Sequence, residues 1–165
     1  MHASAAARIA VGDSIPEAAV QAGPPGETSK LSELVGTGKH ILIGIPGAFT
    51  PTCSDTHVPG YISKRDEFTS KGVDGISVLS VNDAFVMQQW SKSLGAGDKV
   101  KMIADVDGSA TTEMDTGFTA EAVFGPAPRS RRYALLIEDG KVTQALMEGG
   151  GELEKSSADQ MLALL

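Results

Sequence analysis

The sequence predicts one α/β domain with a central mixed β-sheet flanked by helices. Two continuous apolar runs, residues 40–46 and 76–81, are each followed by a segment of helical character, which is typical of buried parallel strands joined by helices. Near the C-terminus, residues 139–140 form an Asp-Gly pair between the strand-like segments 132–138 and 141–147, which predicts an antiparallel hairpin. The length of 165 residues fits a single core.

The N-terminal part is expected to add to this domain and not to form its centre. Residues 1–8 contain alanine, serine and arginine but no secretory apolar region. We interpret them as disordered, as a transit-peptide remnant or as a tag, so the domain covers residues 9–165. Residues 9–30, rich in glycine and proline, predict short extended pieces or a hairpin against the edge of the domain.

The first two helices are expected from their boundary residues. Residues 31–35 form a short helical turn that Gly36 ends. A longer helix begins at Thr50 and should run to about residue 71. Proline has no N–H for the helical ladder, so Pro59 should kink this helix.

The remaining elements alternate between strands and helices. We expect a strand at residues 101–104, irregular structure over 115–130, and helices at 84–94, 109–114 and after a capping box at Ser157 and Gln160. Alternating strands and helices with a hairpin near the end are typical of a thioredoxin-like α/β sandwich.

Composition limits the classes of partner. Hydrophobic residues make up 41% of the chain and charged residues 21%, which is ordinary for a globular protein. The net charge of −7 disfavours nucleic acids and anionic membranes, since only residues 129–132 are locally basic. The apolar run 41–46 is far shorter than the roughly 20 residues of a membrane-spanning helix. We therefore expect no nucleic-acid partner and no membrane partner.

Only one cysteine, Cys53, is present. A single cysteine excludes an internal disulfide and offers no metal-ligand cluster, so we expect no metal and no other cofactor. An intracellular, reducing compartment fits best, in the cytosol or in an organelle such as a plastid or mitochondrion.

Cys53 lies in a setting that favours chemistry over simple packing. Thr50 reads as the N-cap of a helix and Pro51 as its first residue, which places Cys53 at the third helical position, beside Thr50 and the free amides. A helix start favours the thiolate form of a cysteine. The alternative is a small, inert, buried side chain. Turn residues Pro46 and Gly47 place the cysteine at a strand-to-helix junction, so we favour a reactive thiol.

The segment Pro-Gly-Ala-Phe-Thr-Pro-Thr-Cys-Ser-x-x-His-Val-Pro-Gly-Tyr at residues 46–61 resembles the active-site segment of peroxiredoxins, in particular the type II or Prx5-like group. Residues 80–87 with Trp90, and residues 129–136, are similar to the same group in the same order. This resemblance spans nearly the whole chain from about residue 9. It implies a thioredoxin-like fold and a thiol-dependent peroxidase that reduces hydrogen peroxide and alkyl hydroperoxides through a cysteine sulfenic acid.

The arginine that would assist such a cysteine is ambiguous from the strand pattern. Residues 131 and 132 point to opposite faces of a strand, and the pattern does not select between them. The resemblance selects Arg132, the arginine immediately before the aromatic residue. We interpret Arg129 and Arg131 as the solvated basic start of a strand. The resemblance also implies roles for Cys53 as the attacking thiolate, Thr50 as its hydrogen-bonding partner, Pro46 as a shield from water, and the amides of Thr52 and Cys53 as oxygen ligands.

Three further residues are assigned to the substrate site with less definite roles. Gly47 is expected to contact the substrate, and Phe49 is interpreted as part of the core or of the pocket wall. His57, one helical turn after Cys53, either tunes the thiolate or makes a structural contact, and the structural contact is the simpler interpretation.

The sequence departs from its relatives at the resolving cysteine. Many type II members carry one on the strand that is residues 77–80 here, where Val78 matches. This chain would therefore follow a one-cysteine mechanism and need an external thiol: glutathione with glutaredoxin, or thioredoxin. The resemblance also implies a homodimer that packs through loops near the active site.

Two other functions are compatible with a single reactive cysteine. One is a Cys-His hydrolase in which His2, His40 or His57 acts as the base for Cys53. The other is a non-catalytic peroxide sensor or redox chaperone on the same fold, which peroxide would oxidise without steady turnover.

Overall fold

The computed structural model describes residues 8–165. Five strands form its central sheet in the order β5-β4-β3-β8-β9. β3 (Lys39–Ile45), β4 (Gly75–Ser80) and β5 (Lys101–Ala104) are parallel, and β8 (Tyr133–Glu138) and β9 (Lys141–Met147) form the antiparallel hairpin beside β3. The predicted mixed sheet is confirmed. The interpretation of residues 1–8 as disordered, a transit-peptide remnant or a tag concerns residues outside the described part, except for Arg8.

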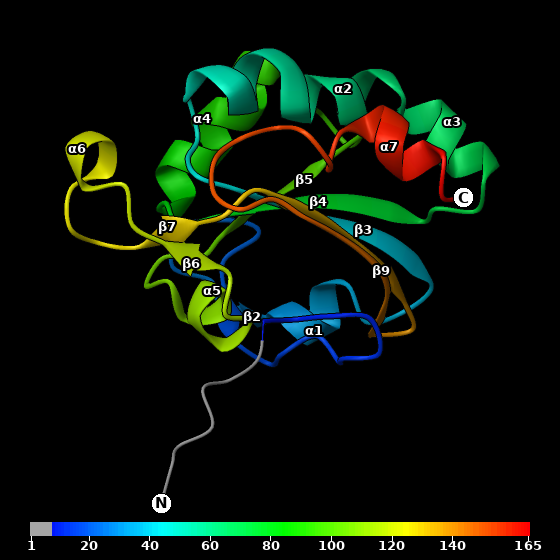
Figure 1. Ribbon diagram of the computed structural model, residues 1–165, viewed down its shortest axis with the longest axis horizontal. Helices are drawn as coiled ribbons and strands as arrows, with labels where there is room; N and C mark the ends of the chain where they lie inside the picture. The colour runs from blue at the N-terminus through cyan, green and yellow to red at the C-terminus, as the bar shows by residue number, and fades with distance from the viewer. Residues whose placement is uncertain (1–7) are drawn as a thin grey trace, which may run out of the picture.

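Helices cover both faces of this sheet (Figure 1). On one face lie α2 (Val58–Ser63), α3 (Arg65–Ser70), α4 (Ala84–Leu94) and α7 (Ala158–Leu162). The other face is covered by α1 (Leu31–Leu34), α5 (Ser109–Glu113) and the small hairpin of β1 (Ala19–Val20) and β2 (Ser29–Lys30).

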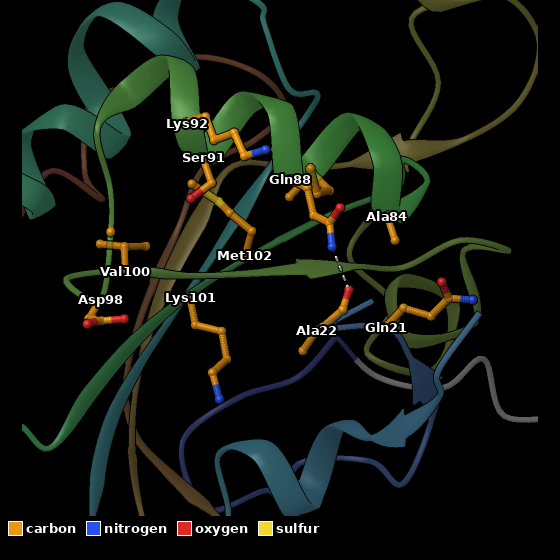
Figure 2. Close-up of a pocket in the computed structure, with 13 residues that line it drawn as sticks. Gln21, Ala22, Ala84, Gln88, Ser91, Lys92, Asp98, Val100, Lys101 and Met102 are labelled. Atoms are coloured by element: carbon orange, nitrogen blue, oxygen red, sulfur yellow. Dashed lines mark hydrogen bonds between the residues drawn. The ribbon is translucent and has the colours of Figure 1, made fainter. Parts of the chain in front are cut away.

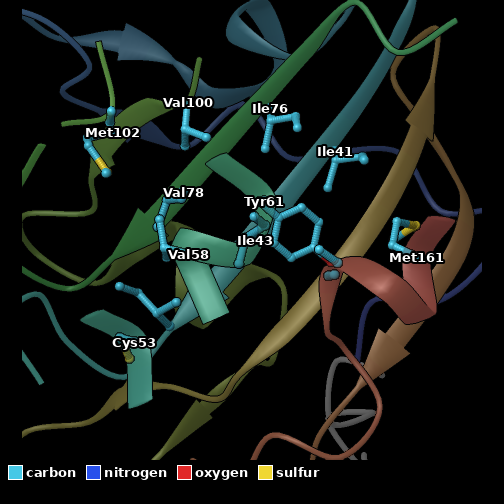
Figure 3. Close-up of a cluster of buried hydrophobic side chains, with 14 of the residues drawn as sticks. Ile41, Ile43, Cys53, Val58, Tyr61, Ile76, Val78, Val100, Met102 and Met161 are labelled. Atoms are coloured by element: carbon cyan, nitrogen blue, oxygen red, sulfur yellow. The ribbon is translucent and has the colours of Figure 1, made fainter. Parts of the chain in front are cut away.

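Residues of β3 alternate between the two cores that result. Ile41, Ile43 and Ile45 pack into the first core, and Leu42 packs into the second. A strand buried on both faces must be apolar at every position, which explains the uninterrupted apolar run in the sequence. Figure 3 shows Ile41 and Ile43 in the first core, together with Tyr61 and Cys53.

The helix expected over residues 50–71 is divided. Residues 51 and 52 are α-helical, a π-helix, η1 (Cys53–His57), follows, and α2 and α3 are separated at Lys64. Pro59 is in the first turn of α2, immediately after η1. Because Pro59 has no N–H, the hydrogen-bond ladder is already interrupted there, and a wider turn accommodates the break.

The segment after α5 contains more structure than expected. β6 (Gly117–Phe118) pairs antiparallel with β7 (Arg129–Ser130), and α6 (Glu121–Phe124) lies between them at one side of the molecule (Figure 1). The capping box of Ser157 and Gln160 at the start of α7 is confirmed.

The register of the sheet places the functional segments together. β3 runs antiparallel to β8, with Gly44 opposite Tyr133. Arg132, which precedes β8, therefore comes beside the C-terminal end of β3, where the segment leading to Cys53 begins.

Candidate active site

The segment between β3 and η1 forms a tight turn before the helix. The Thr50 carbonyl accepts the Ser54 N–H at 2.9 Å, which is the backbone hydrogen bond of an N-cap residue. The expected side-chain cap is absent: the Thr50 hydroxyl donates to the Gly47 carbonyl at 2.7 Å. Phe49 has a φ of 62°, a left-handed conformation within the turn. The Thr50 hydroxyl thus stabilises the turn, and its lone pairs accept no hydrogen bond from the amides of the helix.

Cys53 has no exposed surface and belongs to the first core (Figure 3). Its Sγ accepts a hydrogen bond from Arg132 Nη2 at 3.2 Å. Cys53 and Arg132 are 79 residues apart in sequence, so only the pairing of β3 with β8 brings them together.

Arg132 is buried, and its guanidinium is held by three partners. Nε donates to the Gly151 carbonyl at 3.1 Å, Nη1 donates to His57 Nδ1 at 3.0 Å, and Nη2 contacts the sulfur. The backbone N–H of Arg132 donates to Gly150 at 2.8 Å. A guanidinium fixed in this way presents its charge to the sulfur without reorganisation.

The two neighbouring arginines point elsewhere. Arg131 donates to the carbonyls of Gly117 and Gly149. Arg129 donates to the Val81 carbonyl, and its guanidinium lies 4.9 Å from the centre of the Phe124 ring. Of the three arginines, Arg132 is the one whose side chain reaches Cys53.

His57 is buried and lies between Arg132 and the C-terminal segment. Its Nε2 is 2.9 Å from the Ser156 carbonyl, which can only accept, so Nε2 carries the proton and Nδ1 accepts from Arg132. Burial, and then the charge of Arg132, lower the pKa of His57 to about 4, although the Ser156 carbonyl and Glu148 act in the opposite direction. His57 is therefore a neutral imidazole at physiological pH.

A cavity of about 280 Å³ lies over these residues. Its lining combines residues around the sulfur with an apolar wall from the segment after α5, and consists of Pro46, Thr50, Pro51, Thr52, Phe118, Ala120, Val123, Phe124, Arg132 and Gly151. Four predicted site residues thus line it: Pro46, Thr50, Thr52 and Arg132.

The other predicted site residues are adjacent to the cavity without lining it. Cys53 and His57 lie beneath, in contact with Arg132. Gly47 is in the turn below Thr50, and Phe49 is 54% exposed with its ring 6.5 Å from that of Trp90. The sequence analysis missed the apolar wall of Phe118, Val123 and Phe124, because residues in an irregular segment show no periodicity that would assign them to a site.

A larger cavity lies elsewhere. It has a volume of about 500 Å³ and is enclosed by α4, β5 and residues 21–23, with Gln88 donating to the Gly23 carbonyl across one side (Figure 2). None of the predicted site residues lines it.

Neither a metal site nor a membrane span is found in residues 8–165. In that part of the chain, no three histidine, cysteine or acidic side chains come close enough to bind a metal ion together. Its helices are too short or too polar for any of them to cross a bilayer.

A cysteine sulfur at the start of a helix, hydrogen-bonded to a buried guanidinium on a sheet of this topology, defines a thiol-based oxidoreductase of the thioredoxin fold. The Redoxin family model matches residues 10–162. The chain therefore belongs to the Redoxin family, and within it to the type II peroxiredoxins, which are thiol peroxidases.

The relatives agree with this placement. Peroxiredoxin-2B of Arabidopsis thaliana is 45% identical over 162 residues, which are 96% of this chain and 99% of that protein. The chloroplastic Peroxiredoxin-2E of the same plant is 43% identical over 96% of this chain and 70% of its own length. A crystal structure of reduced Prx3 from Vibrio vulnificus in complex with H2O2 has a TM-score of 0.88 at 39% identity, covering 95% of this chain and 99% of that one.

The expected fold, peroxidase activity and one-cysteine mechanism are thus confirmed. The hydrolase alternative lacks a base within the described residues. Both ring nitrogens of His57 are engaged by Ser156 and Arg132. His40 is at the N-terminal end of β3, paired with Gly75, whereas Cys53 follows the C-terminal end of that strand. His2 lies outside the described residues.

Proposed function

We propose that the Cys53 thiolate attacks hydrogen peroxide or a small alkyl hydroperoxide with the help of Arg132. The contact of 3.2 Å between Arg132 Nη2 and Cys53 Sγ carries this proposal. Arg132 spends three of the five N–H donors of a guanidinium on Gly151, His57 and the sulfur. Two donors remain for the peroxide at the floor of the cavity that Arg132 lines.

The reaction moves two electrons from sulfur to the peroxide. A sulfur–oxygen bond forms as the oxygen–oxygen bond breaks, and the leaving oxygen takes one proton to become water or an alcohol. Negative charge develops on that oxygen, so a guanidinium aimed at it stabilises the transition state. Cys53 becomes a sulfenic acid.

The remaining predicted residues would orient the peroxide. The Thr50 lone pairs can accept its O–H, because the hydroxyl hydrogen is used on Gly47. The amides of Thr52 and Cys53 are in the first helical turn, where N–H groups have no intrahelical acceptor, and can donate to an oxygen. Pro46 covers one side of the cavity and would limit the access of water to Cys53. The wall of Phe118, Val123 and Phe124 favours small alkyl hydroperoxides beside hydrogen peroxide.

Return to the thiol requires an external reductant, because the chain has no second cysteine. A thiol condenses with the sulfenic acid, releases water and forms a mixed disulfide, which a second thiol reduces. Cys53 is fully buried, so the first turn of the helix has to open for a thiol larger than the peroxide. Glutathione with glutaredoxin, or thioredoxin, would serve in a reducing compartment of the cytosol or an organelle.

A homodimer would cover the exposed aromatic residues near the site. Phe49 is 54% exposed and Phe85, at the start of α4, is 69% exposed. Large apolar side chains that are exposed next to a functional site are typical of an interface. Sedimentation of the reduced protein as a monomer at every accessible concentration would contradict this part of the proposal.

Peroxide consumption under steady turnover tests the function. The variant Cys53→Ser should be inactive, and Arg132→Ala should lose on the order of 100-fold or more, the usual cost of removing one donor to a developing oxyanion. Arg131→Ala is the matched control and should stay close to the wild-type rate. The assay should compare glutathione plus glutaredoxin with thioredoxin plus its reductase. Oxidation of Cys53 with no turnover under either system would indicate a peroxide sensor instead.

A further inference from the structure

Glu148, the residue directly after β9, has a buried carboxylate. It is 1% exposed, and its backbone N–H donates to the Arg132 carbonyl at 3.0 Å. Burying an ionised carboxylate is costly unless hydrogen bonds compensate it. Its Oε1 is buried and has no hydrogen-bond partner within the described residues. Hydrogen bonds therefore compensate the burial of only one of the two carboxylate oxygens.

All the side-chain hydrogen bonds of Glu148 go to one short segment through its other oxygen. Oε2 accepts the backbone N–H groups of Glu154, Lys155 and Ser156 at 2.9, 2.8 and 3.0 Å, and the Ser156 hydroxyl at 2.9 Å. Successive amides that converge on one anion form a nest and fix the backbone around it. Glu148 therefore sets the orientation of residues 154–156.

The carbonyl of that segment is the acceptor for two buried donors. The Ser156 carbonyl receives His57 Nε2–H at 2.9 Å and the Tyr61 hydroxyl at 2.8 Å. This contact determines the histidine tautomer, and the tautomer leaves Nδ1 as an acceptor for Arg132 Nη1 at 3.0 Å. Nη2 of the same guanidinium reaches the sulfur.

We propose that Glu148 is a positioning residue for the peroxidase reaction: it holds residues 154–156 so that the Ser156 carbonyl orients His57, and His57 orients Arg132 against Cys53. This inference rests on the proposed function of Arg132. The competing interpretation is that Glu148 only attaches the C-terminal segment and α7 to the sheet.

The variant Glu148→Gln separates the two interpretations, because it keeps the shape and removes the charge that holds three amides. The second-order rate constant for H2O2 should fall at least about tenfold, since a misplacement of about 1 Å at a reacting centre can cost on the order of 100-fold. The rate of Cys53 alkylation by iodoacetamide, measured at about pH 10 where an ordinary thiol is ionised without a neighbouring cation, should be unchanged or higher, because alkylation then needs the thiolate but not a guanidinium aimed at a leaving oxygen. A purely structural role would change both rates alike.

Asp105→Asn is the matched control. Asp105 is also a buried carboxylate, and it accepts the N–H groups of Ala110 and Thr111 and the Thr111 hydroxyl at the start of α5. Its partner Ala110 packs in the second core, whereas Cys53 packs in the first. This variant should lose stability and keep the ratio of the peroxide rate to the alkylation rate.

A double-mutant cycle identifies the route. If Glu148 acts through His57, then Glu148→Gln should add little to the loss caused by His57→Leu. Additive losses, or a Glu148→Gln variant with a wild-type rate ratio, would overturn the proposal. If Glu148→Gln does not fold, Ser156→Ala takes its place, since it removes one of the four hydrogen bonds, and it should lower the rate ratio in the same direction. An active Arg132→Ala variant would refute the function of Arg132 itself, which is a separate outcome.

Discussion

At the scale of single residues, the neutral His57 is as informative as the cysteine. An imidazolium would carry a proton on both nitrogens and direct one N–H at the guanidinium of Arg132. Burial and the charge of Arg132 prevent this and lower the pKa of His57 to about 4. His57 can therefore act as an acceptor for Arg132 throughout the physiological pH range.

The low pKa of His57 makes folding stability depend on pH. The imidazole of His57 binds a proton below about pH 6.5 in the unfolded chain, but only below about pH 4 in the folded chain. The contribution of His57 to the free energy of unfolding is therefore complete above pH 6.5 and decreases as the pH falls towards 4. Between pH 7 and pH 5 the free energy of unfolding should drop by about 2 kcal/mol through this group.

Urea unfolding of the wild type and of His57→Asn at the two pH values measures that contribution. The variant should lack this part of the pH dependence, whereas His40→Asn should retain it. An identical pH dependence in the wild type and the His57 variant would contradict the assignment.

At the scale of elements, two residues four apart in η1 face the same interior because they are separated by about one helical turn. Cys53 and His57 are buried while Asp55 and Thr56 between them are exposed. Both buried side chains meet the same guanidinium. A helix start with a cysteine and a histidine at this spacing therefore forms one half of the site, and the strand pair β3 and β8 supplies the other half.

The pairing of β3 with β8 depends on a glycine. A Cβ added at Gly44 would overlap the ring of Tyr133, which is buried and directly follows Arg132. Gly44→Ala should therefore cost about 2 kcal/mol or more through overpacking. It should also lower the peroxide rate, because β8 carries Arg132 with it.

Gly23→Ala is the control for this substitution, since no atom lies within 4 Å of a Cβ there and its backbone is not left-handed. Thermal unfolding and the H2O2 rate constant measure both effects. A stable and fully active Gly44→Ala protein would show that the ring can move aside without moving Arg132.

At the scale of the whole molecule, a single cysteine limits how the oxidised chain can react. Val78, where the resemblance to type II peroxiredoxins would place a resolving cysteine, is fully buried in β4. In the proposed mechanism, the catalytic cycle therefore passes through a mixed disulfide with another molecule.

Mass spectrometry after one equivalent of H2O2 and then one equivalent of glutathione tests this limit, because no second thiol is left to reduce the mixed disulfide. Each chain should carry one glutathione on Cys53 and show no intramolecular disulfide. Without a thiol, further peroxide should convert the sulfenic acid to the sulfinic and sulfonic acids. Cys53→Ser should remain unmodified, and glutathione on that variant would refute Cys53 as the site.

Much of the fold could be predicted because its signals are local. The Asp139-Gly140 turn, with φ values of 48° and 82°, and the capping box at Ser157 depend only on neighbouring residues. The division of the helix after Thr50 could not be predicted in detail. The sequence indicated a break at Pro59, but the form that it takes depends on how Cys53 and His57 pack against the core.

The sequence by itself determined the candidate reactive residue, the strand-to-helix junction around it and, for the proposed one-cysteine mechanism, the need for an external thiol, since a single cysteine and its flanking turn residues are properties of the chain. Only the tertiary structure decided that Arg132 reaches the sulfur, that His57 contacts Arg132, and that an apolar wall from the segment after α5 encloses the cavity. These contacts join residues far apart in sequence, and their distances depend on strand register and side-chain packing, which local patterns do not encode.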